Sequence, residues 1–224
     1  MKPTVIFDLD GTLLDTLEDL KDSTNYAMRV FHFPERTLDE VRAFVGNGLG
    51  MLIRRASPAG TDEETLSRAL AVMKSHYAKN YHNKTVPYPG IPELLQHLKA
   101  DGYPMAIVSN KADLVVRLLR ELYFRDLIPV AVGETENISR KPAPDMVYEG
   151  MRRLGVEDHP AVYIGDSDVD IQTAANAGLP CLSVSWGFRS RERLKAAGAS
   201  YIIDTPDELF AAIHSEIWKS SSIQ

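Results

Sequence analysis

The chain has 224 residues, of which 44% are hydrophobic and 25% charged, as in a globular protein with one domain or one domain and an insertion. Its net charge of −6 argues against a nucleic-acid-binding protein. No stretch approaches the roughly 20 apolar residues that cross a bilayer, the N-terminus does not resemble a signal peptide, and the only cysteine, Cys181, favours a reducing compartment. We therefore expect a cytoplasmic protein that has neither nucleic acid nor membrane as a partner.

In chain order, the first predicted element is a short buried strand at Thr4–Phe7, which leads into the sequence FDLDGTLLD. From Thr16 to about Tyr81, apolar residues recur every three or four positions, which predicts several amphipathic helices. The stretch Asn83–Pro92 contains three prolines and a glycine and is typical of a linker. The predicted structure thus changes twice before residue 100, from a strand to a block of helices and then to a linker.

Beyond the linker, apolar strands alternate with helices. The predicted strands are Met105–Val108, Ile128–Val132, Val162–Ile164, Leu182–Val184 and Tyr201–Ile203, and the predicted helices include Asp113–Leu122, Pro144–Leu154 and Asp168–Ala177, the last ended by Gly178. This alternation predicts a parallel sheet that helices cover on both faces. The first strand belongs to the same sheet. We therefore expect an α/β fold with a doubly wound, Rossmann-like parallel sheet core at 1–15 and 84–224, and a small α-helical domain inserted at 16–83.

Polar residues gather where these strands end, and in open parallel sheets ligands bind beyond the carboxyl ends of the strands. The first strand ends in DLDGT from Asp8, the next in Ser109-Asn110 and a later one in GDSDVD from Gly165, while RKPAP from Arg140 precedes a helix. Asp8 and Asp10 point the same way in an extended segment, so their charges repel unless a cation lies between them. Carboxylates, a hydroxyl and a lysine are the parts of a magnesium and phosphate site.

The four motifs FDLDGTLLD, VSNK, RKPAPD and GDSDVD, in this order and spacing, closely resemble those of the haloacid dehalogenase-like hydrolase superfamily. The resemblance covers nearly the whole chain, and the helical insertion resembles the small helical cap of that superfamily. It implies a Mg²⁺-dependent phosphatase that acts on a small phosphorylated metabolite.

The resemblance also implies a role for each motif residue. Asp8 is expected to attack phosphorus and become an aspartyl phosphate, and Asp10 to protonate the leaving oxygen and then activate water. The phosphoryl group is expected to be held by Ser109 and Lys141, with help from Gly11, Thr12 and Asn110. The expected Mg²⁺ ligands are Asp8, Asp10 through its carbonyl, and Asp166, with Asp170 either supporting the metal or orienting Lys141. Mg²⁺ and the lysine are needed because a carboxylate attacking a phosphate dianion is an approach of two anions.

Two stretches, FVGNGLGMLIRRA and SWGFRSRERLKAAGASYIID, resemble phosphoglycolate phosphatases within this superfamily, so 2-phosphoglycolate is the first expected substrate. The loop Gly46-Asn47-Gly48 leads into a predicted helix, Leu49–Ala56, whose free N–H groups favour a substrate carboxylate. We therefore count Asn47 and Gly48 as substrate-binding candidates, with Arg54 and Arg55 as second candidates. The oligomeric state stays open.

Other interpretations remain beside this one. Pyrophosphatases, nucleotidases and β-phosphoglucomutases share the same framework, and a phospho-aspartate signalling receiver or an inactive relative is the alternative of another class. The basic run Arg189, Arg191, Arg193 and Lys195 is expected to be a solvated helix face, and Trp186-Gly187 either ends a strand or lies near the site. Cys181 is expected to be a buried small hydrophobic residue and not a nucleophile.

Overall fold

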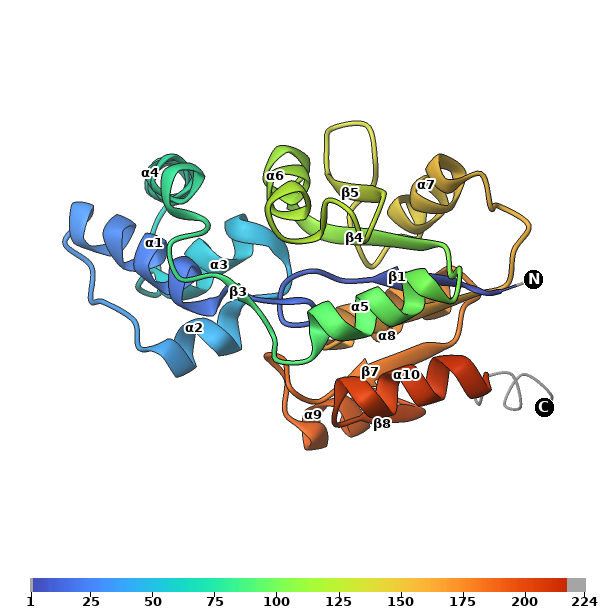
Figure 1. Ribbon diagram of the computed structural model, residues 1–224. Coiled ribbons are helices and arrows are strands. Elements are labelled where there is room, and N and C mark those ends of the chain that lie inside the picture. Colours follow the sequence, from blue (N-terminus) through green and yellow to red (C-terminus); the bar gives the residue numbers. More distant parts are fainter. Residues whose placement is uncertain (1, 217–224) are drawn as a thin grey trace. The chain divides into compact units, whose positions relative to one another are not determined.

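The computed structural model describes residues 2–216 (Figure 1). Within it the chain divides into two compact units. The core unit consists of the residues up to Leu14 together with those from Pro87 onward, and the helical unit of Asp15–Val86.

The core unit is built on a six-stranded parallel sheet with the strand order β5-β4-β1-β6-β7-β8. The strands are β1 (Thr4–Phe7), β4 (Met105–Ala112), β5 (Val130–Glu134), β6 (Ala161–Gly165), β7 (Cys181–Val184) and β8 (Tyr201–Ile203). From the central β1 the chain adds strands first on one side and then on the other. This reversal places the carboxyl ends of β1, β4 and β6 next to one another, where open α/β sheets form their ligand-binding crevice.

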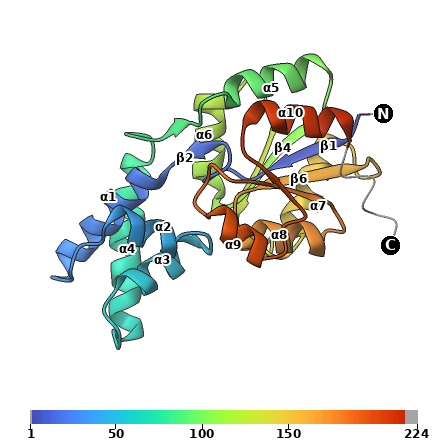
Figure 2. The same cartoon turned by 90° about the horizontal axis from the view of Figure 1, so that it is seen from below.

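Helices cover both faces of this sheet. They are α5 (Ile91–Ala100), α6 (Asp113–Phe124), α7 (Asp145–Leu154), α8 (Asp168–Asn176), α9 (Arg191–Ala196) and α10 (Pro206–Ser215). Figure 2 shows α5 and α10 on one side of the strands and α7 and α8 on the other. Because both faces are covered, the central strands are apolar throughout, and all four residues of β1 are buried. The predicted doubly wound α/β fold is confirmed.

The helical unit contains α1 (Leu17–Val30), α2 (Leu38–Phe44), α3 (Gly48–Ala56) and α4 (Glu63–Asn80). Its core is formed by apolar side chains at helical spacing, among them Met28, Leu52, Met73 and Tyr77. Polar side chains define where two of these helices begin, since Thr37 forms a capping box with Glu40, and Asp62 caps α4. The block of helices predicted for this part of the chain is confirmed.

Most predicted elements of the core unit are observed with small shifts at their ends, and two features were missed. The predicted linker Asn83–Pro92 ends earlier, because Gly90, at a φ of 84°, caps α5, which the sequence analysis did not predict. A separate two-stranded sheet pairs β2 (Leu14–Asp15) with β3 (Val86–Pro87), where the chain leaves and re-enters the core unit. Strands of two residues carry no periodic signal, so the sequence alone could not reveal them.

A buried carboxylate anchors the two ends of the helical unit. Asp19, in the first turn of α1, is 2% exposed and accepts hydrogen bonds from Lys84 N (3.0 Å), Thr85 N (2.9 Å) and Thr85 Oγ1 (2.8 Å). Asp22, one turn further along α1, pairs with the Lys84 ammonium at 2.7 Å, but its side chain is 40% exposed.

We expect Asp19→Asn to lower the free energy of unfolding by about 2 kcal/mol, because hydrogen bonds to a buried charged acceptor contribute about 1.5–3 kcal/mol. Urea denaturation followed by circular dichroism measures the loss. The matched control Asp22→Asn should cost less than about 1 kcal/mol, as exposed ion pairs do. Equal effects of the two substitutions would contradict the anchoring role of Asp19.

Candidate active site

The site lies at the carboxyl ends of β1, β4 and β6, and the ammonium of Lys141 is at its centre. Lys141 Nζ lies 2.8 Å from Asp8 Oδ1, 2.8 Å from Asp170 Oδ1 and 3.0 Å from the Tyr163 hydroxyl. Lys141 is only 4% exposed. Burial by itself lowers the pKa of Lys141, but the charges of Asp170 and Asp8 together raise it above its ordinary value. The lysine is therefore held as a cation.

Asn110, at the end of β4, fixes the backbone around Lys141. Its Oδ1 accepts a hydrogen bond from Lys141 N (2.7 Å), and its Nδ2 donates to Lys141 O (3.0 Å). Asn110 and Ser109 are both buried. The role predicted for Asn110 in binding phosphate stays a prediction, and the observed role of its side chain is to position the lysine.

Three buried carboxylates form a cluster at this site, and two of them, Asp8 and Asp170, pair with the lysine. Asp8, Asp166 and Asp170 each offer an oxygen within 4.8 Å of the others, and they are the group that could hold a metal ion among the described residues. Burial, followed by the charge of Asp170, raises the pKa of Asp8 to about 7, although Lys141 opposes this. Burial and the charges of Asp170 and Asp8 likewise raise the pKa of Asp166 well above its ordinary value. The cluster holds more negative charge than its lysine can balance, which suits a hard divalent cation with oxygen ligands.

Asp170 differs from Asp166 in how fully protein donors occupy its oxygens: each oxygen of Asp170 accepts two hydrogen bonds, whereas those of Asp166 accept one each, from Thr12 Oγ1 and Phe188 N. Oδ1 accepts from Lys141 Nζ and Tyr163 OH, while Oδ2 accepts from the Ser167 amide and hydroxyl. Ser167 in turn caps α8: its hydroxyl accepts from the Asp170 amide, so Ser167 and Asp170 form a capping box that fixes both the start of the helix and the Asp170 carboxylate. Of the two roles left open for Asp170, this geometry favours the orientation of Lys141.

Asp10 lies outside the acidic cluster and pairs with a lysine that the sequence analysis did not assign. Lys111 is 7% exposed, and its Nζ donates to Asp10 Oδ1. The sequence held a signal for this residue, since Lys111 follows Ser109 by two positions in a strand and therefore points to the same side. Pairing with Asp10 depends on β1 lying beside β4. The metal contact predicted through the Asp10 carbonyl stays a prediction.

The loop after β7 closes against the acids of the site. Phe188 N donates to Asp166 Oδ2 (2.6 Å), and Trp186 Nε1 donates to Thr12 O (3.0 Å). A Cβ on Gly187 would lie 2.3 Å from both Gly11 O and Asp166 Cβ, so only glycine fits there. Gly11 is constrained in the same way, with a φ of +89° and an added Cβ 2.4 Å from Asp166 Oδ2. Of the two predictions for Trp186-Gly187, a place near the site is the one observed.

The prediction for Arg189 is wrong. It was expected on a solvated helix face, but it precedes α9, is 4% exposed, and lies with its Nε 3.4 Å from Asp168 Oδ1. The physical reason is that the loop after β7 turns inward before the helix begins. Cys181 is half-buried, and burial raises the pKa of its thiol to about 12, which agrees with the prediction that it is not a nucleophile.

In the helical unit, the glycine loop connects α2 to α3 as predicted. Gly46 and Gly48 adopt φ values of 120° and 77°, and Asn47 makes no side-chain cap to α3. Instead, Arg55 donates to Asn47 Oδ1 (3.0 Å) and Phe44 O (2.6 Å).

The other arginine of this pair, Arg54, forms an ion pair with Glu63. Both arginine candidates are therefore engaged within the helical unit. The substrate roles of Asn47 and Gly48 stay predictions.

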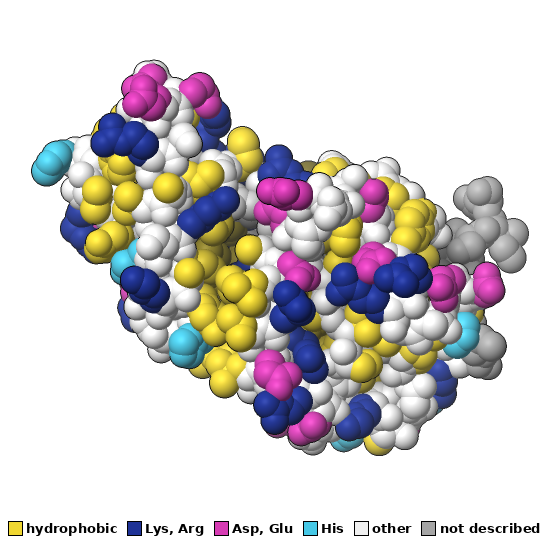
Figure 3. Space-filling view, turned by 90° about the horizontal axis from the view of Figure 1, so that it is seen from above, with side chains coloured by type: hydrophobic (Ala, Val, Ile, Leu, Met, Phe, Trp, Pro, Cys, Tyr) yellow, Lys and Arg dark blue, Asp and Glu magenta, His cyan; other side chains and the backbone are white. Residues whose placement is uncertain are grey.

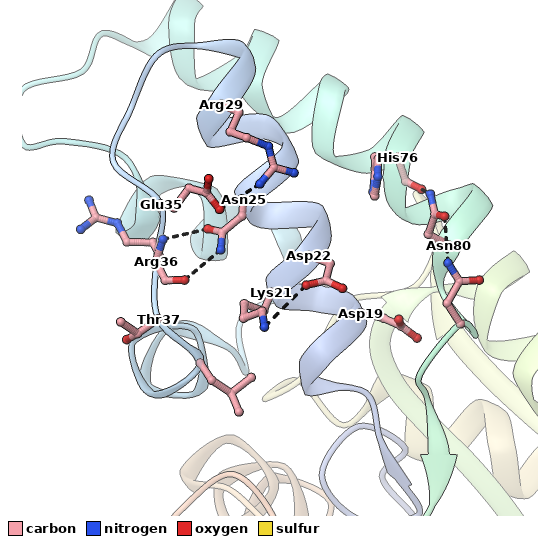
Figure 4. A pocket seen from close by; sticks show the side chains of 12 residues that line it. Asp19, Lys21, Asp22, Asn25, Arg29, Glu35, Arg36, Thr37, His76 and Asn80 are labelled. Carbon is pink, nitrogen blue, oxygen red and sulfur yellow. Dashed lines mark hydrogen bonds and ion pairs between the residues drawn. The ribbon is translucent and has the colours of Figure 1, made fainter.

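A cavity of about 710 Å³ lies within the helical unit (Figure 4). Arg29 pairs with Glu35 at 2.8 Å, and Asn25 exchanges hydrogen bonds with both backbone groups of Arg36. Charged and polar residues that line this cavity are thus paired with one another. The acidic cluster of the core unit, in contrast, has an excess of negative charge.

Comparisons with known proteins agree with this geometry. Residues 5–184 match the family model of the haloacid dehalogenase-like hydrolases. A phosphoglycolate phosphatase of Pseudomonas savastanoi pv. phaseolicola is 34% identical over 206 residues, covering 89% of this chain and 75% of that protein. One from Rhodobacter capsulatus is 37% identical, covering 84% and 87%. The crystal structure of a putative phosphoglycolate phosphatase from Lactobacillus delbrueckii subsp. bulgaricus superposes with a TM-score of 0.90 at 37% identity, covering 95% and 99%.

The chain belongs to the haloacid dehalogenase-like hydrolase family. The family and the relatives indicate a phosphatase, a phosphoric monoester hydrolase, of the branch that includes phosphoglycolate phosphatases, and this confirms the predicted enzyme class. None of the helices in residues 2–216 combines the length and apolar character that a bilayer crossing requires.

The raised pKa of Asp8 makes the effect of a metal on stability depend on pH. The folded state binds this proton more tightly than the unfolded state does. In the metal-free protein, stability should therefore fall as pH rises between the ordinary value of 3.8 and about 7. A divalent cation removes that penalty. We expect Mg²⁺ to raise the melting temperature more at about pH 8 than at about pH 5.5.

Thermal scans with Mg²⁺ and with chelator at both pH values measure this difference. Asp166→Asn should abolish the Mg²⁺-induced rise, while the exposed Asp22→Asn should leave it intact. A rise that is equal at both pH values, or larger at the lower one, would argue against ionised acids as the ligands.

Proposed function

We propose that this phosphatase hydrolyses 2-phosphoglycolate, a short ester with phosphate at one end and a carboxylate at the other, through an aspartyl phosphate on Asp8. The observation that carries the proposal is the buried Asp8–Lys141–Asp170 arrangement at the carboxyl end of β1. The names of the related proteins support the choice of substrate.

In the proposed reaction, Asp8 Oδ attacks phosphorus and the ester oxygen leaves. Asp8 is suited to this role because Lys141 fixes one of its oxygens at 2.8 Å, and Asp170 and Tyr163 fix the lysine in turn. Lys141 and Ser109 then hold the transferring phosphoryl group. Water cleaves the acyl phosphate in the second step, so that one slow hydrolysis is divided into two easier steps.

We assign Mg²⁺ to this site, with Asp8 and Asp166 and the backbone carbonyl of Asp10 as its protein ligands. When bound, Mg²⁺ offsets the repulsion between the Asp8 carboxylate and the phosphate dianion. Asp170 is assigned to the orientation of Lys141, because its two oxygens already accept four hydrogen bonds.

Asp10 is the proposed general acid and base, and Lys111 its positioning residue. Asp10 must give its proton to the leaving oxygen, so the position of its carboxyl group determines the rate of the first step. The Lys111 ammonium contacts Oδ1 of Asp10 and is itself buried at the end of β4. We propose that this contact fixes the Asp10 carboxylate where it can reach the leaving group.

The substrate carboxylate is assigned to the N-terminus of α3. The first N–H groups of a helix have no partner within the helix, and an anion there is favoured by the helix dipole. Gly50 leaves room at this end, since a Cβ there would meet nothing closer than Leu70 Cδ2 at 3.8 Å.

The substrate test compares kcat/KM for 2-phosphoglycolate with that for ethyl phosphate, which lacks the carboxylate. We expect 2-phosphoglycolate to be preferred by about 10-fold or more, as for a charge-assisted hydrogen bond. Gly50→Pro removes one first-turn N–H and should reduce the preference, whereas the control Gly50→Ala keeps that N–H and should retain it. Equal kcat/KM values for the two esters would contradict this substrate and direct the search to nucleotides, pyrophosphate or sugar phosphates.

The two aspartates should separate in a trapping experiment with p-nitrophenyl phosphate, whose leaving group departs without a proton. Asp8→Asn should show no turnover and no acid-trapped phosphoenzyme, because an amide is a poor nucleophile. Asp10→Asn should still form the phosphoenzyme but hydrolyse it about 10²–10⁴-fold more slowly. Trapped phosphoenzyme in Asp8→Asn would place the nucleophile elsewhere.

Lys111→Met should lower the rate of phosphoenzyme formation from ethyl phosphate by about 10-fold or more, but the rate of formation from p-nitrophenyl phosphate much less, because only the first leaving group needs a proton. A purely structural role of Lys111 would lower both values equally. Lys111→Arg, which keeps the positive charge, should recover part of the loss. The ratio of the two formation rates, from acid trapping in a single turnover, is the measurement.

A further inference from the structure

Helix α6 of the core unit presents a row of exposed leucines. Leu114, Leu118 and Leu122, spaced four residues apart, are 62%, 42% and 54% exposed. The opposite side of α6 is buried through Val116, Leu119 and Phe124. Figure 3 looks onto the side of the molecule that carries α6, where hydrophobic side chains stand out beside charged ones. Contiguous apolar surface of this kind marks interaction sites.

A row of charges with alternating sign lies beside the leucines. Asp113, Arg117, Glu121 and Arg125 follow one another at the same four-residue spacing. Asp113 pairs with Arg117 at 2.9 Å, and Glu121 pairs with Arg125. The side chains of Arg117 and Glu121 are 58% and 42% exposed, so the middle of the row is open to a partner.

We propose that this face of α6 docks against α6 of a second copy of the chain, antiparallel about a two-fold axis near Leu118. In that arrangement Leu118 meets Leu118 of the second copy, and Leu114 meets Leu122. About this axis residue i lies level with residue 236 − i of the second copy, so Arg117 falls two positions, about 3 Å along the helix, from alignment with Glu121 of that copy, and Asp113 lies in the same way towards Arg125. Under one symmetry operation the leucine row thus matches itself, and the charge row does so to within two residues, a distance that arginine and glutamate side chains span, as an isologous interface requires.

This double match is the reason to choose a second copy over another partner. An unrelated partner would need one charge row complementary to α6, but it would not need α6 to be complementary to itself. A single pair of helices is small compared with the interfaces of stable dimers. We therefore expect a monomer–dimer equilibrium that depends on protein concentration. The inference is independent of the proposed substrate, because it uses none of the residues assigned to the reaction.

Sedimentation velocity over a concentration series tests the dimer. The unmodified chain should shift from monomer towards dimer as its concentration rises. Arg117→Glu places two acids opposite each other and should give monomer only, as should Glu121→Arg, which opposes two bases. The double variant Arg117→Glu/Glu121→Arg restores both pairings and should dimerise again. Turnover of p-nitrophenyl phosphate at low concentration confirms that each variant is folded.

Cysteine crosslinking tests the position of the axis. Leu118→Cys should form a disulfide-linked dimer on oxidation, since the residue meets its own copy. Leu114→Cys and Leu122→Cys should crosslink efficiently only when the two variants are mixed. Tyr148→Cys, at an exposed position of α7 (52% exposed), and the unmodified chain with Cys181 are the controls. A monomer at every concentration, or crosslinking through Tyr148→Cys as fast as through Leu118→Cys, would overturn the proposal.

Discussion

The ion pairs of the Lys141 ammonium with Asp8 and Asp170 are the interaction on which the site depends. They place one cation among three buried acids, where each charge would be costly by itself. The neighbouring carboxylates keep the buried lysine charged, and the lysine in turn fixes the position of the Asp8 carboxylate. Asn110, Tyr163 and Ser167 serve the pairs by fixing the lysine backbone, its ammonium and the acid behind it. Together these contacts form a preorganised site that still has an excess of negative charge, and this excess is the physical basis for assigning a divalent cation to it.

This arrangement follows from the order of the strands. Because later strands are added first on one side of β1 and then on the other, residues from β1, β4 and β6 meet although more than 150 positions separate the first from the last. The glycines allow the backbone segments to approach: Gly11 and Gly187 both lie against Asp166, and neither position tolerates a Cβ. The loop after β7 then supplies Phe188 N to the same acid. The crevice is therefore crowded by backbone as much as by side chains, and this limits how far the acids can move apart.

The two units divide the work in the function we propose. The core unit contains every residue assigned to the chemistry, while the helical unit supplies the α3 N-terminus assigned to the substrate carboxylate. In this proposal the site at the strand ends recognises the phosphate, which every candidate ester carries, so the choice of ester must come from outside it. Helix α6 adds a further surface of the core unit, with a leucine row and a charge row that are both complementary to themselves.

The sequence by itself determined the α/β class, the helical insertion and the acids, hydroxyl and lysine at the strand ends, because these depend on local periodicity and on the chemistry of short motifs. Thr4–Phe7 and Tyr201–Ile203 were predicted to the residue. Only the tertiary structure decided the pairing of Lys111 with Asp10, the burial of Arg189 and the bonding of Asn110 to the Lys141 backbone. It also distinguished the environment of Asp170 from that of Asp166. The physical reason is that these contacts join residues 31 to 101 positions apart or depend on how a loop turns, and both follow from strand order and register, which a linear pattern does not contain.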